Sequence, residues 1–279
     1  MEYLTLYNGV KIPQLGFGVF QIPEYTKAKK AVLSALKVGY RLIDTAQAYG
    51  NEQAVGDAIR ESGIPREEIF ITSKIWISDF SFERAQDATR RSLERLGTDY
   101  IDLMLLHQPM GDYIGAWRGL EKLYNEGTVK AIGMANCYPH VLVDLCETFQ
   151  IRPMLNQVEM HPFFQQEKNL ETMKKYDVTP EAWAPFNEGK RNFFHDPILT
   201  EIGEKYHKTA AQVALRWNLQ RGVVVIPKTV HEDRMRQNFE VFDFTLSEED
   251  MEKIRGMDIG HSEIVDHFDP EWIKMLHSM

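Results

Sequence analysis

Eight short apolar runs, separated by amphipathic stretches, place the strongest constraint on how this 279-residue chain can fold. Between the runs, charged residues recur at helical spacing, as in "SFERAQDATRRSLERLG". Strands that are apolar along their whole length belong to parallel sheets covered by helices. The pattern therefore predicts an α/β fold with strands at about 15–19, 41–44, 69–74, 101–106, 129–135, 154–158, 178–183 and 223–226.

The number of repeats and the chain length favour a closed (β/α)8 TIM barrel, which typically needs about 250 residues. No linker, low-complexity segment or shift in composition divides the chain, so residues 1–279 are expected to form one domain. An N-terminal β-hairpin is expected because Asn8-Gly9 lies between two apolar arms. The alternative is an open doubly wound sheet, whose nucleotide-binding form usually carries G-x-G-x-x-G. Residues 16–21 read GFGVFQ and lack the third glycine, which weighs against it.

Composition argues against several kinds of partner and site. The net charge of -9 disfavours nucleic acid, because Lys and Arg supply most of the affinity for phosphates. No window approaches 18 uninterrupted apolar residues and no signal peptide is recognisable, so no membrane association is expected. Two cysteines, Cys137 and Cys146, imply no disulfide framework and favour a cytoplasmic protein.

Four chemically active residues follow three consecutive predicted strands. Asp44 ends the second run, Tyr49 lies in its loop, Lys74 ends the third run and His107 follows the fourth. Alone, each has an ordinary interpretation: a helix cap, a packed aromatic ring, a solvated charge or a hydrogen-bonded histidine. Because barrel chemistry gathers at the carboxyl ends of strands, their occurrence together favours a catalytic site.

The four residue types suit proton transfer. A lysine ammonium next to a phenol favours the phenolate, so Lys74 is expected to lower the pKa of Tyr49 from its usual ~10. Asp44 would keep that lysine charged and oriented, and His107 would donate a hydrogen bond to a substrate oxygen. Such a set protonates a developing alkoxide. Carbonyl reduction fits, with hydride from a cofactor, since no side chain is a hydride source.

Five segments carry a family resemblance: "LIDTAQAYGNE", "ITSKIW", "LLHQP", "NQVEMHP" and "VIPKTVHEDRMRQNFEVFDFTLS". With them the chain resembles an aldo-keto reductase over nearly its whole length, closest to the bacterial 2,5-diketo-D-gluconate reductase-like branch. The resemblance implies that Tyr49 is the general acid in carbonyl reduction and the base in alcohol oxidation. It also implies that Lys74, held by Asp44, tunes Tyr49, and that His107 orients the carbonyl.

The resemblance further implies NADPH as cofactor, extended across the barrel mouth. Asn136 and Gln157 would hold the nicotinamide carboxamide, and Trp183 would stack on the ring. Ala135 stands where the family usually has serine, so one hydrogen bond to the carboxamide, worth about 0.5–1.5 kcal/mol, is missing or replaced.

The segment after the eighth run is expected to bind phosphate. A helix start preceded by Lys228 and Thr229 makes a good anion site, and barrels often hold phosphate here. By resemblance, these two residues and Arg234 would bind the adenosine 2′-phosphate, which favours NADPH over NADH. The whole implied cofactor set is Gly18, Val19, Asp44, Asn136, Gln157, Trp183, Pro185, Lys228, Thr229, Val230, Arg234, Gln237 and Asn238.

A small-molecule carbonyl compound is the expected substrate, lined by Phe20, Trp76, His107 and Gln108. Gln108 stands where relatives carry Trp, and a polar side chain there could admit hydrophilic substrates. The tail after residue 257 is shorter than in mammalian members, which implies an open pocket. Small aldehydes, methylglyoxal-like dicarbonyls or keto-sugars would fit. A monomer is favoured, although no sequence feature specifies the oligomeric state.

Two alternatives come from other functional classes. A metal-dependent hydrolase would need several His, Asp or Glu ligands at strand ends. Asp44 and His107 are the only candidates there, and Lys74 disfavours a cation, so no metal site is expected; His161 is interpreted as structural. A non-catalytic, cofactor-sensing partner protein of the same fold is the other alternative, and the complete tetrad argues against it.

Overall fold

The computed structural model describes the whole chain, Met1–Met279, and confirms the predicted barrel. Eight parallel strands form one sheet in which each strand pairs with the next along the chain. A parallel bridge between Leu15 and Val225 joins the first strand to the last and closes the barrel. The strands are β3 (Phe17–Gly18), β4 (Leu42–Asp44), β5 (Phe70–Ile75), β6 (Leu103–Leu106), β7 (Ile132–Ala135), β8 (Leu155–Glu159), β9 (Thr179–Trp183) and β10 (Val224–Val225).

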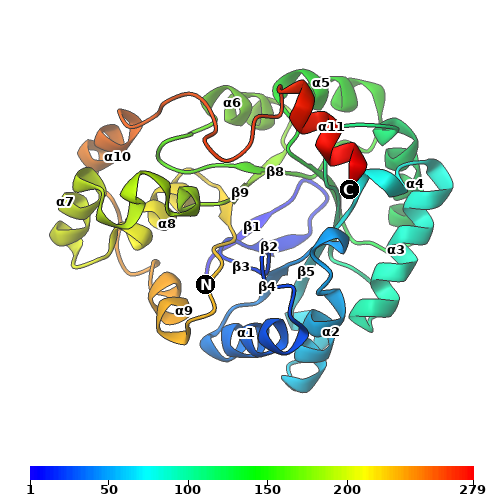
Figure 1. Cartoon of the computed structure of the whole chain (residues 1–279), viewed down its shortest axis with the longest axis horizontal. Coiled ribbons are helices and arrows are strands. Elements are labelled where there is room, and N and C mark those ends of the chain that lie inside the picture. The colour runs from blue at the N-terminus through cyan, green and yellow to red at the C-terminus, as the bar shows by residue number, and fades with distance from the viewer.

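Helices surround the strands (Figure 1). None of them is long and apolar enough to cross a membrane. The α-helices are α1 (Tyr25–Val38), α2 (Glu52–Glu61), α3 (Phe82–Leu96), α4 (Tyr113–Asn125), α5 (Pro139–Thr148), α6 (Glu167–Lys175), α7 (Pro197–Tyr206), α8 (Ala210–Gln220), α9 (Glu232–Phe239), α10 (Glu248–Arg255) and α11 (Pro270–Ser278). Shorter 3-10 segments are η1 (Gln47–Tyr49), η2 (Arg66–Glu68), η3 (Ile77–Asp79) and η4 (Asn187–His195).

Local sequence explains where α3 begins and ends. The Ser81 hydroxyl accepts a hydrogen bond from the backbone N–H of Arg84 at 3.2 Å, which caps the first turn. Gly97 ends the helix at φ 63°, in the left-handed region that glycine adopts without steric cost. The short loop that follows returns the chain to the amino end of β6.

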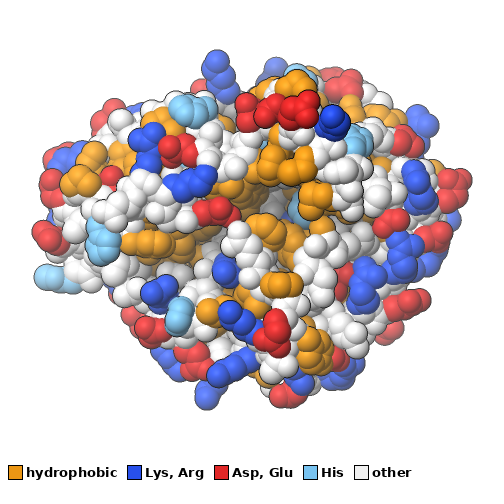
Figure 2. Space-filling view, in the orientation of Figure 1, with side chains coloured by type: hydrophobic (Ala, Val, Ile, Leu, Met, Phe, Trp, Pro, Cys, Tyr) orange, Lys and Arg blue, Asp and Glu red, His pale blue; other side chains and the backbone are white.

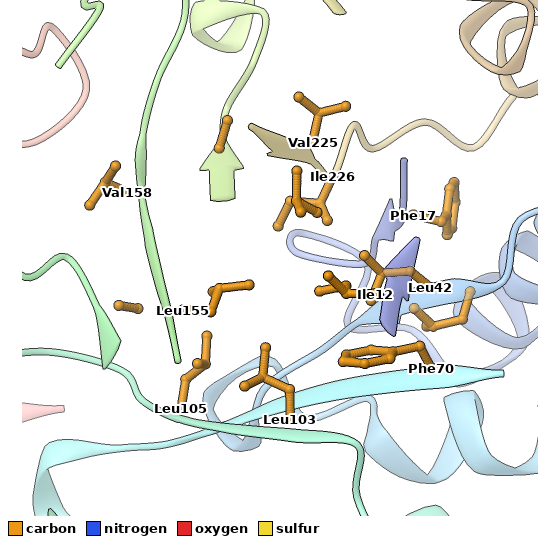
Figure 3. Packing of buried hydrophobic residues seen from close by; sticks show 14 of the residues in the cluster. Ile12, Phe17, Leu42, Phe70, Leu103, Leu105, Leu155, Val158, Val225 and Ile226 are labelled. Carbon is orange, nitrogen blue, oxygen red and sulfur yellow. The ribbon is translucent and has the colours of Figure 1, made fainter. Parts of the chain in front are cut away.

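The predicted hairpin is confirmed and lies at the amino ends of the strands. β1 (Tyr3–Thr5) pairs antiparallel with β2 (Lys11–Pro13), and Gly9 turns between them at φ 90°. The buried Ile12 side chain lies among the interior side chains of the barrel (Figure 3). The hairpin therefore closes the end of the barrel opposite the loops that follow the strands.

The barrel interior has an apolar floor and a polar upper layer. Alternate side chains of a strand share a face, so the side chain two positions after an interior Leu also points into the barrel. On β4, Asp44 is two positions after Leu42, and on β8, Gln157 is two positions after Leu155. Polar groups thus gather at the carboxyl ends, above a floor whose labelled members include Leu42, Phe70, Leu103, Leu105 and Leu155 (Figure 3).

Candidate active site

The ammonium group of Lys74 lies at the centre of the predicted tetrad. Its Nζ donates to Asp44 Oδ1 at 2.6 Å, to the Thr45 carbonyl at 3.0 Å and to Tyr49 Oη at 3.3 Å. Lys74 is 0 % exposed, so these three oxygens replace water around its charge. The His107 ring lies 5.7 Å from the Tyr49 ring, centroid to centroid. The structure therefore brings all four predicted residues together.

The pKa of Tyr49 was expected to be lowered, but its net shift is upward, so this prediction is wrong. Burial raises the pKa of Tyr49 above its usual value, and this outweighs the Lys74 charge, which acts in the lowering direction. The Asp44 carboxylate adds to the increase, because it disfavours a second negative charge nearby. Tyr49 is therefore held as a protonated phenol, the form that a proton donor requires.

His107 is held neutral. Burial, and then the Lys74 charge, keep the pKa of its imidazole well below the usual value. Its Nδ1 is buried and has no partner within the protein. A neutral imidazole has one N–H donor, which suits the predicted role of holding a substrate oxygen.

The predicted carboxamide-binding residues are hydrogen-bonded to the tetrad. Gln157 Nε2 donates to Asp44 Oδ2 at 2.8 Å, and Asn136 Nδ2 donates to the His107 carbonyl at 3.0 Å. Trp183 Nε1 donates to Asn136 Oδ1 at 2.9 Å, which fixes the orientation of the indole. These three side chains therefore form a rigid continuation of the tetrad toward β7, β8 and β9.

A cleft of about 740 Å³ opens over this polar layer. Figure 2 shows it as a hollow with hydrophobic side chains around it. All four predicted substrate-lining residues line the cleft. Val19, which was predicted to contact the cofactor, is fully buried and does not line it. Of the predicted cofactor residues, those that line it are Gly18, Asp44, Asn136, Gln157, Trp183, Pro185 and Lys228.

The remaining predicted cofactor residues lie beyond the cleft, in the segment from β10 into α9. They are Thr229, Val230, Arg234, Gln237 and Asn238, and only Thr229 and Asn238 are buried. No side chain caps the N-terminus of α9, so its first N–H groups are available to an anion. Burial, and then the charge of Lys27, lower the pKa of Lys228, which shows two cations close together here.

The C-terminal segment lines part of the cleft. The open pocket that the short tail implies stays a prediction. Sequence reasoning missed these wall residues, although their spacing contains a signal. Trp272, Leu276 and Met279 recur at the i, i+4, i+7 spacing of one helix face. The segment's lining residues are Ile264, Val265, His267, Trp272, Met275, Leu276 and Met279.

Hydrogen bonds of two residues, Ser262 and Glu263, hold this segment in place. Ser262 Oγ donates to Glu159 Oε2 at 2.5 Å, and Glu159 also contacts His161 Nε2 at 2.9 Å. The next residue, Glu263, accepts hydrogen bonds from Arg191 Nε at 2.7 Å and Asn187 Nδ2 at 3.1 Å. His161 is fully buried and contacts Glu159, which fits its interpretation as a structural residue. No three His, Cys, Asp or Glu side chains lie close enough to hold a metal ion.

Comparisons with known proteins agree with this geometry. The model of the aldo/keto reductase family matches residues 14–259. The chain is 47% identical over 257 residues to a protein named glyoxal reductase from Bacillus subtilis, covering 92% of each. It is 39% identical over 260 residues to methylglyoxal reductase DkgA of Escherichia coli, covering 92% of this chain and 94% of that one.

A solved structure extends the agreement to three dimensions. The aldo-keto reductase of Bombyx mori in complex with NADP superposes with a TM-score of 0.91 at 30% identity, covering 95% of each chain. Family match, relatives and fold all point the same way. This chain belongs to the aldo/keto reductase family and is an oxidoreductase.

Proposed function

We propose that this chain catalyses the NADPH-dependent reduction of aldehydes or ketones to alcohols. The observation that carries the proposal is the single Lys74 ammonium that joins Asp44 at 2.6 Å to the Tyr49 hydroxyl at 3.3 Å. Both Tyr49 and His107 border the same cleft, so one carbonyl oxygen can meet both. This arrangement supports proton donation to a developing alkoxide.

The polar groups of the cleft fit a nicotinamide dinucleotide. The nitrogen of the Gln157 amide is occupied, which leaves its oxygen as an acceptor for a carboxamide N–H. Lys228 and the uncapped N-terminus of α9 suit a phosphate. NADPH, when bound, supplies the hydride.

Ala135 offers no hydroxyl, so Ala135→Ser should tighten NADPH binding about 2- to 10-fold.

The protein's part in the reaction is proton transfer and orientation. Tyr49 donates its proton to the oxygen of the carbonyl as hydride reaches the carbon, and Lys74 stabilises the negative charge left on the phenol. The neutral His107 donates a hydrogen bond to the same oxygen and orients it. In alcohol oxidation the roles reverse, and the Tyr49 phenolate accepts the proton.

A preference for NADPH over NADH follows from the cations near α9. Lys228, Thr229 and Arg234 are proposed to hold the 2′-phosphate, since Arg234 is exposed and Lys228 lies with Lys27. The measurement is kcat/KM with each cofactor. Equal values, or a preference for NADH, would contradict this assignment.

Small aldehydes, including 2-oxoaldehydes, are the proposed substrate class. The relatives named glyoxal reductase and methylglyoxal reductase act on such compounds by name. In this chain, Trp272 lines the cleft, and its Nε1 is buried without a partner within the protein. A rotation of the indole that brings this donor to the cleft would let it bind a second carbonyl oxygen, which a 2-oxoaldehyde carries and a simple aldehyde lacks.

The test is a substrate panel followed by NADPH absorbance, with Tyr49→Phe as the decisive variant. Loss of general acid catalysis should lower kcat by about 10²- to 10⁴-fold while NADPH still binds. Full activity of Tyr49→Phe would refute the proposed proton donor. If the wild-type chain bound NADPH but reduced no carbonyl compound, the non-catalytic, cofactor-sensing alternative would replace this proposal.

We further propose that residues 1–279 form one domain that acts as a monomer. Seventy buried hydrophobic residues form one cluster that includes parts of the hairpin, the barrel and the helices. A single core of this kind is expected to unfold as a unit. Analytical ultracentrifugation gives the test, and a stable dimer would overturn the monomer.

A further inference from the structure

The Glu181 side chain lies inside the barrel, and Glu181 belongs neither to the tetrad nor to the predicted cofactor-binding residues. It lies on β9, is 0 % exposed, and pairs in register with Gln157 of β8. Its Oε2 accepts a hydrogen bond from Gln157 Nε2 at 3.2 Å, while Oε1 is buried without a partner. Burying an incompletely bonded carboxyl group costs free energy, so packing alone does not account for a glutamate here.

Glu181 and Asp44 together determine which way the Gln157 amide points. An amide nitrogen carries two hydrogens, and here one is donated to Asp44 Oδ2 at 2.8 Å and the other to Glu181. The opposite orientation would set the amide oxygen against the Asp44 carboxylate. With its nitrogen held inside the barrel, Gln157 presents its oxygen to the cleft that it lines.

The two carboxyl groups bonded to this amide have different surroundings. The Lys74 ammonium neutralises Asp44 at 2.6 Å, whereas no cation bonds to Glu181. Burial, and then the Asp44 charge, raise the pKa of Glu181 to about 8. The charged or titratable groups that face it are Asp44 of β4, Lys74 of β5 and Tyr49 of η1. Its strand neighbours, Gln157 and Val224, are neutral.

We propose that Glu181 is a positioning residue, whose carboxyl group holds the Gln157 amide so that the amide oxygen is ready to accept from the carboxamide N–H of the cofactor. The inference rests on the proposed NADPH-dependent function. Without Glu181, one Gln157 hydrogen loses its acceptor, and only the bond to Asp44 Oδ2 opposes rotation of the amide. A rotated amide would present N–H to the N–H of the carboxamide, and binding would weaken.

The experiment measures the dissociation constant of NADPH by quenching of tryptophan fluorescence. Glu181→Leu, which has no acceptor, should bind NADPH about 3- to 10-fold more weakly than wild type, the equivalent of one lost hydrogen bond. Glu181→Gln keeps an acceptor oxygen and should remain within about twofold. Thr72→Val is the matched control, because Thr72 is another buried residue of the barrel whose hydroxyl has no partner.

A second arm separates positioning from packing. If Glu181 acts through Gln157, then Glu181→Leu should have no further effect on NADPH affinity in a Gln157→Leu background. A merely structural role would give the same loss in both backgrounds. Circular dichroism and thermal unfolding confirm that each variant is folded before its affinity is compared.

Two outcomes overturn the inference. They are wild-type NADPH affinity in Glu181→Leu, and an equal loss of affinity in Glu181→Gln and Glu181→Leu. Failure of the wild-type chain itself to bind NADPH would instead refute the proposed function.

Discussion

At the residue scale, the site depends on a charge pair from which water is excluded. Lys74 and Asp44 are 0 % and 3 % exposed at the side chain, and their ion pair at 2.6 Å is supported by the Gln157 amide. Such pairs contribute little net stability, because desolvation offsets their attraction, but removing one partner leaves a buried charge uncompensated. The pair therefore serves orientation and charge at Tyr49 more than it serves folding.

Lys74→Met should lower the free energy of unfolding by about 3–5 kcal/mol, because it leaves the Asp44 carboxylate buried without a cation. The double variant Lys74→Met with Asp44→Asn removes both charges and should recover much of that loss. Urea unfolding of the two variants and wild type measures both differences. A single variant as stable as wild type would contradict the prediction.

The two directions of the reaction should depend on pH in opposite ways. Reduction needs protonated Tyr49, and because its pKa is raised, this form persists into alkaline solution. Oxidation needs the phenolate, so its kcat should rise with pH over the range where Tyr49 titrates. His107, with a lowered pKa, stays neutral throughout. Profiles of kcat against pH in both directions check this, and an oxidation optimum below pH 7 would contradict it.

At the scale of elements, the loop after β9 and the C-terminal segment are two walls of one cleft. The loop holds Ala184, Asn187 and Arg191 at φ of 47°, 49° and 54°, a conformation that costs free energy in residues other than glycine. Glu263 accepts hydrogen bonds from Asn187 and Arg191, and its carbonyl accepts one from Lys190. One side chain of the tail thus stabilises the loop.

Glu263→Ala should raise KM for carbonyl substrates about 3- to 10-fold, because the segment that carries the wall residues Ile264 and Val265 keeps Ser262 but loses its second anchor. Steady-state kinetics at saturating NADPH measure the change. Glu271→Ala is the matched control, since Glu271 is an exposed acid of the same segment whose Lys274 contact is also exposed. An equal effect of both variants would mean that surface charge, and not the anchor, sets KM.

At the scale of the whole molecule, the two ends of the barrel have different tasks. The hairpin and the apolar floor close the amino end (Figure 3), whereas the cleft opens at the carboxyl end (Figure 2), where the tetrad lies. The side chains of the floor therefore serve stability, while the proposed reaction takes place at the carboxyl ends of the strands. Changes at one end should leave the other largely unaffected.

Ile12→Ala, at the floor, should lower the free energy of unfolding by about 2–5 kcal/mol, because Ile12 is 0 % exposed and its loss leaves a cavity. At 25 °C, kcat/KM should stay within about twofold of wild type, since additivity holds for distant sites. Tyr3→Ala is the control, as Tyr3 of the same hairpin is 53 % exposed. A large kinetic effect would show that the two ends are coupled.

By itself, the sequence predicted the barrel and the hairpin, which the structure confirms, and it named the four residues of the proposed tetrad. Strand and helix periodicity are local, and Asn8-Gly9 specifies a turn whatever surrounds it. Asp44, Tyr49 and Lys74 could be named because barrel topology brings consecutive strand ends to one face.

Tertiary structure alone decided the features that depend on burial and on distant partners. Gln157 bonds Asp44 across 113 positions of the chain, and Ser262 bonds Glu159 across 103. Neither pairing follows from local spacing. The direction of the Tyr49 pKa shift depends on how completely water is excluded, which outweighs the nearby Lys74 charge. Desolvation of a side chain depends on how the whole molecule packs around it, so local sequence does not predict its size.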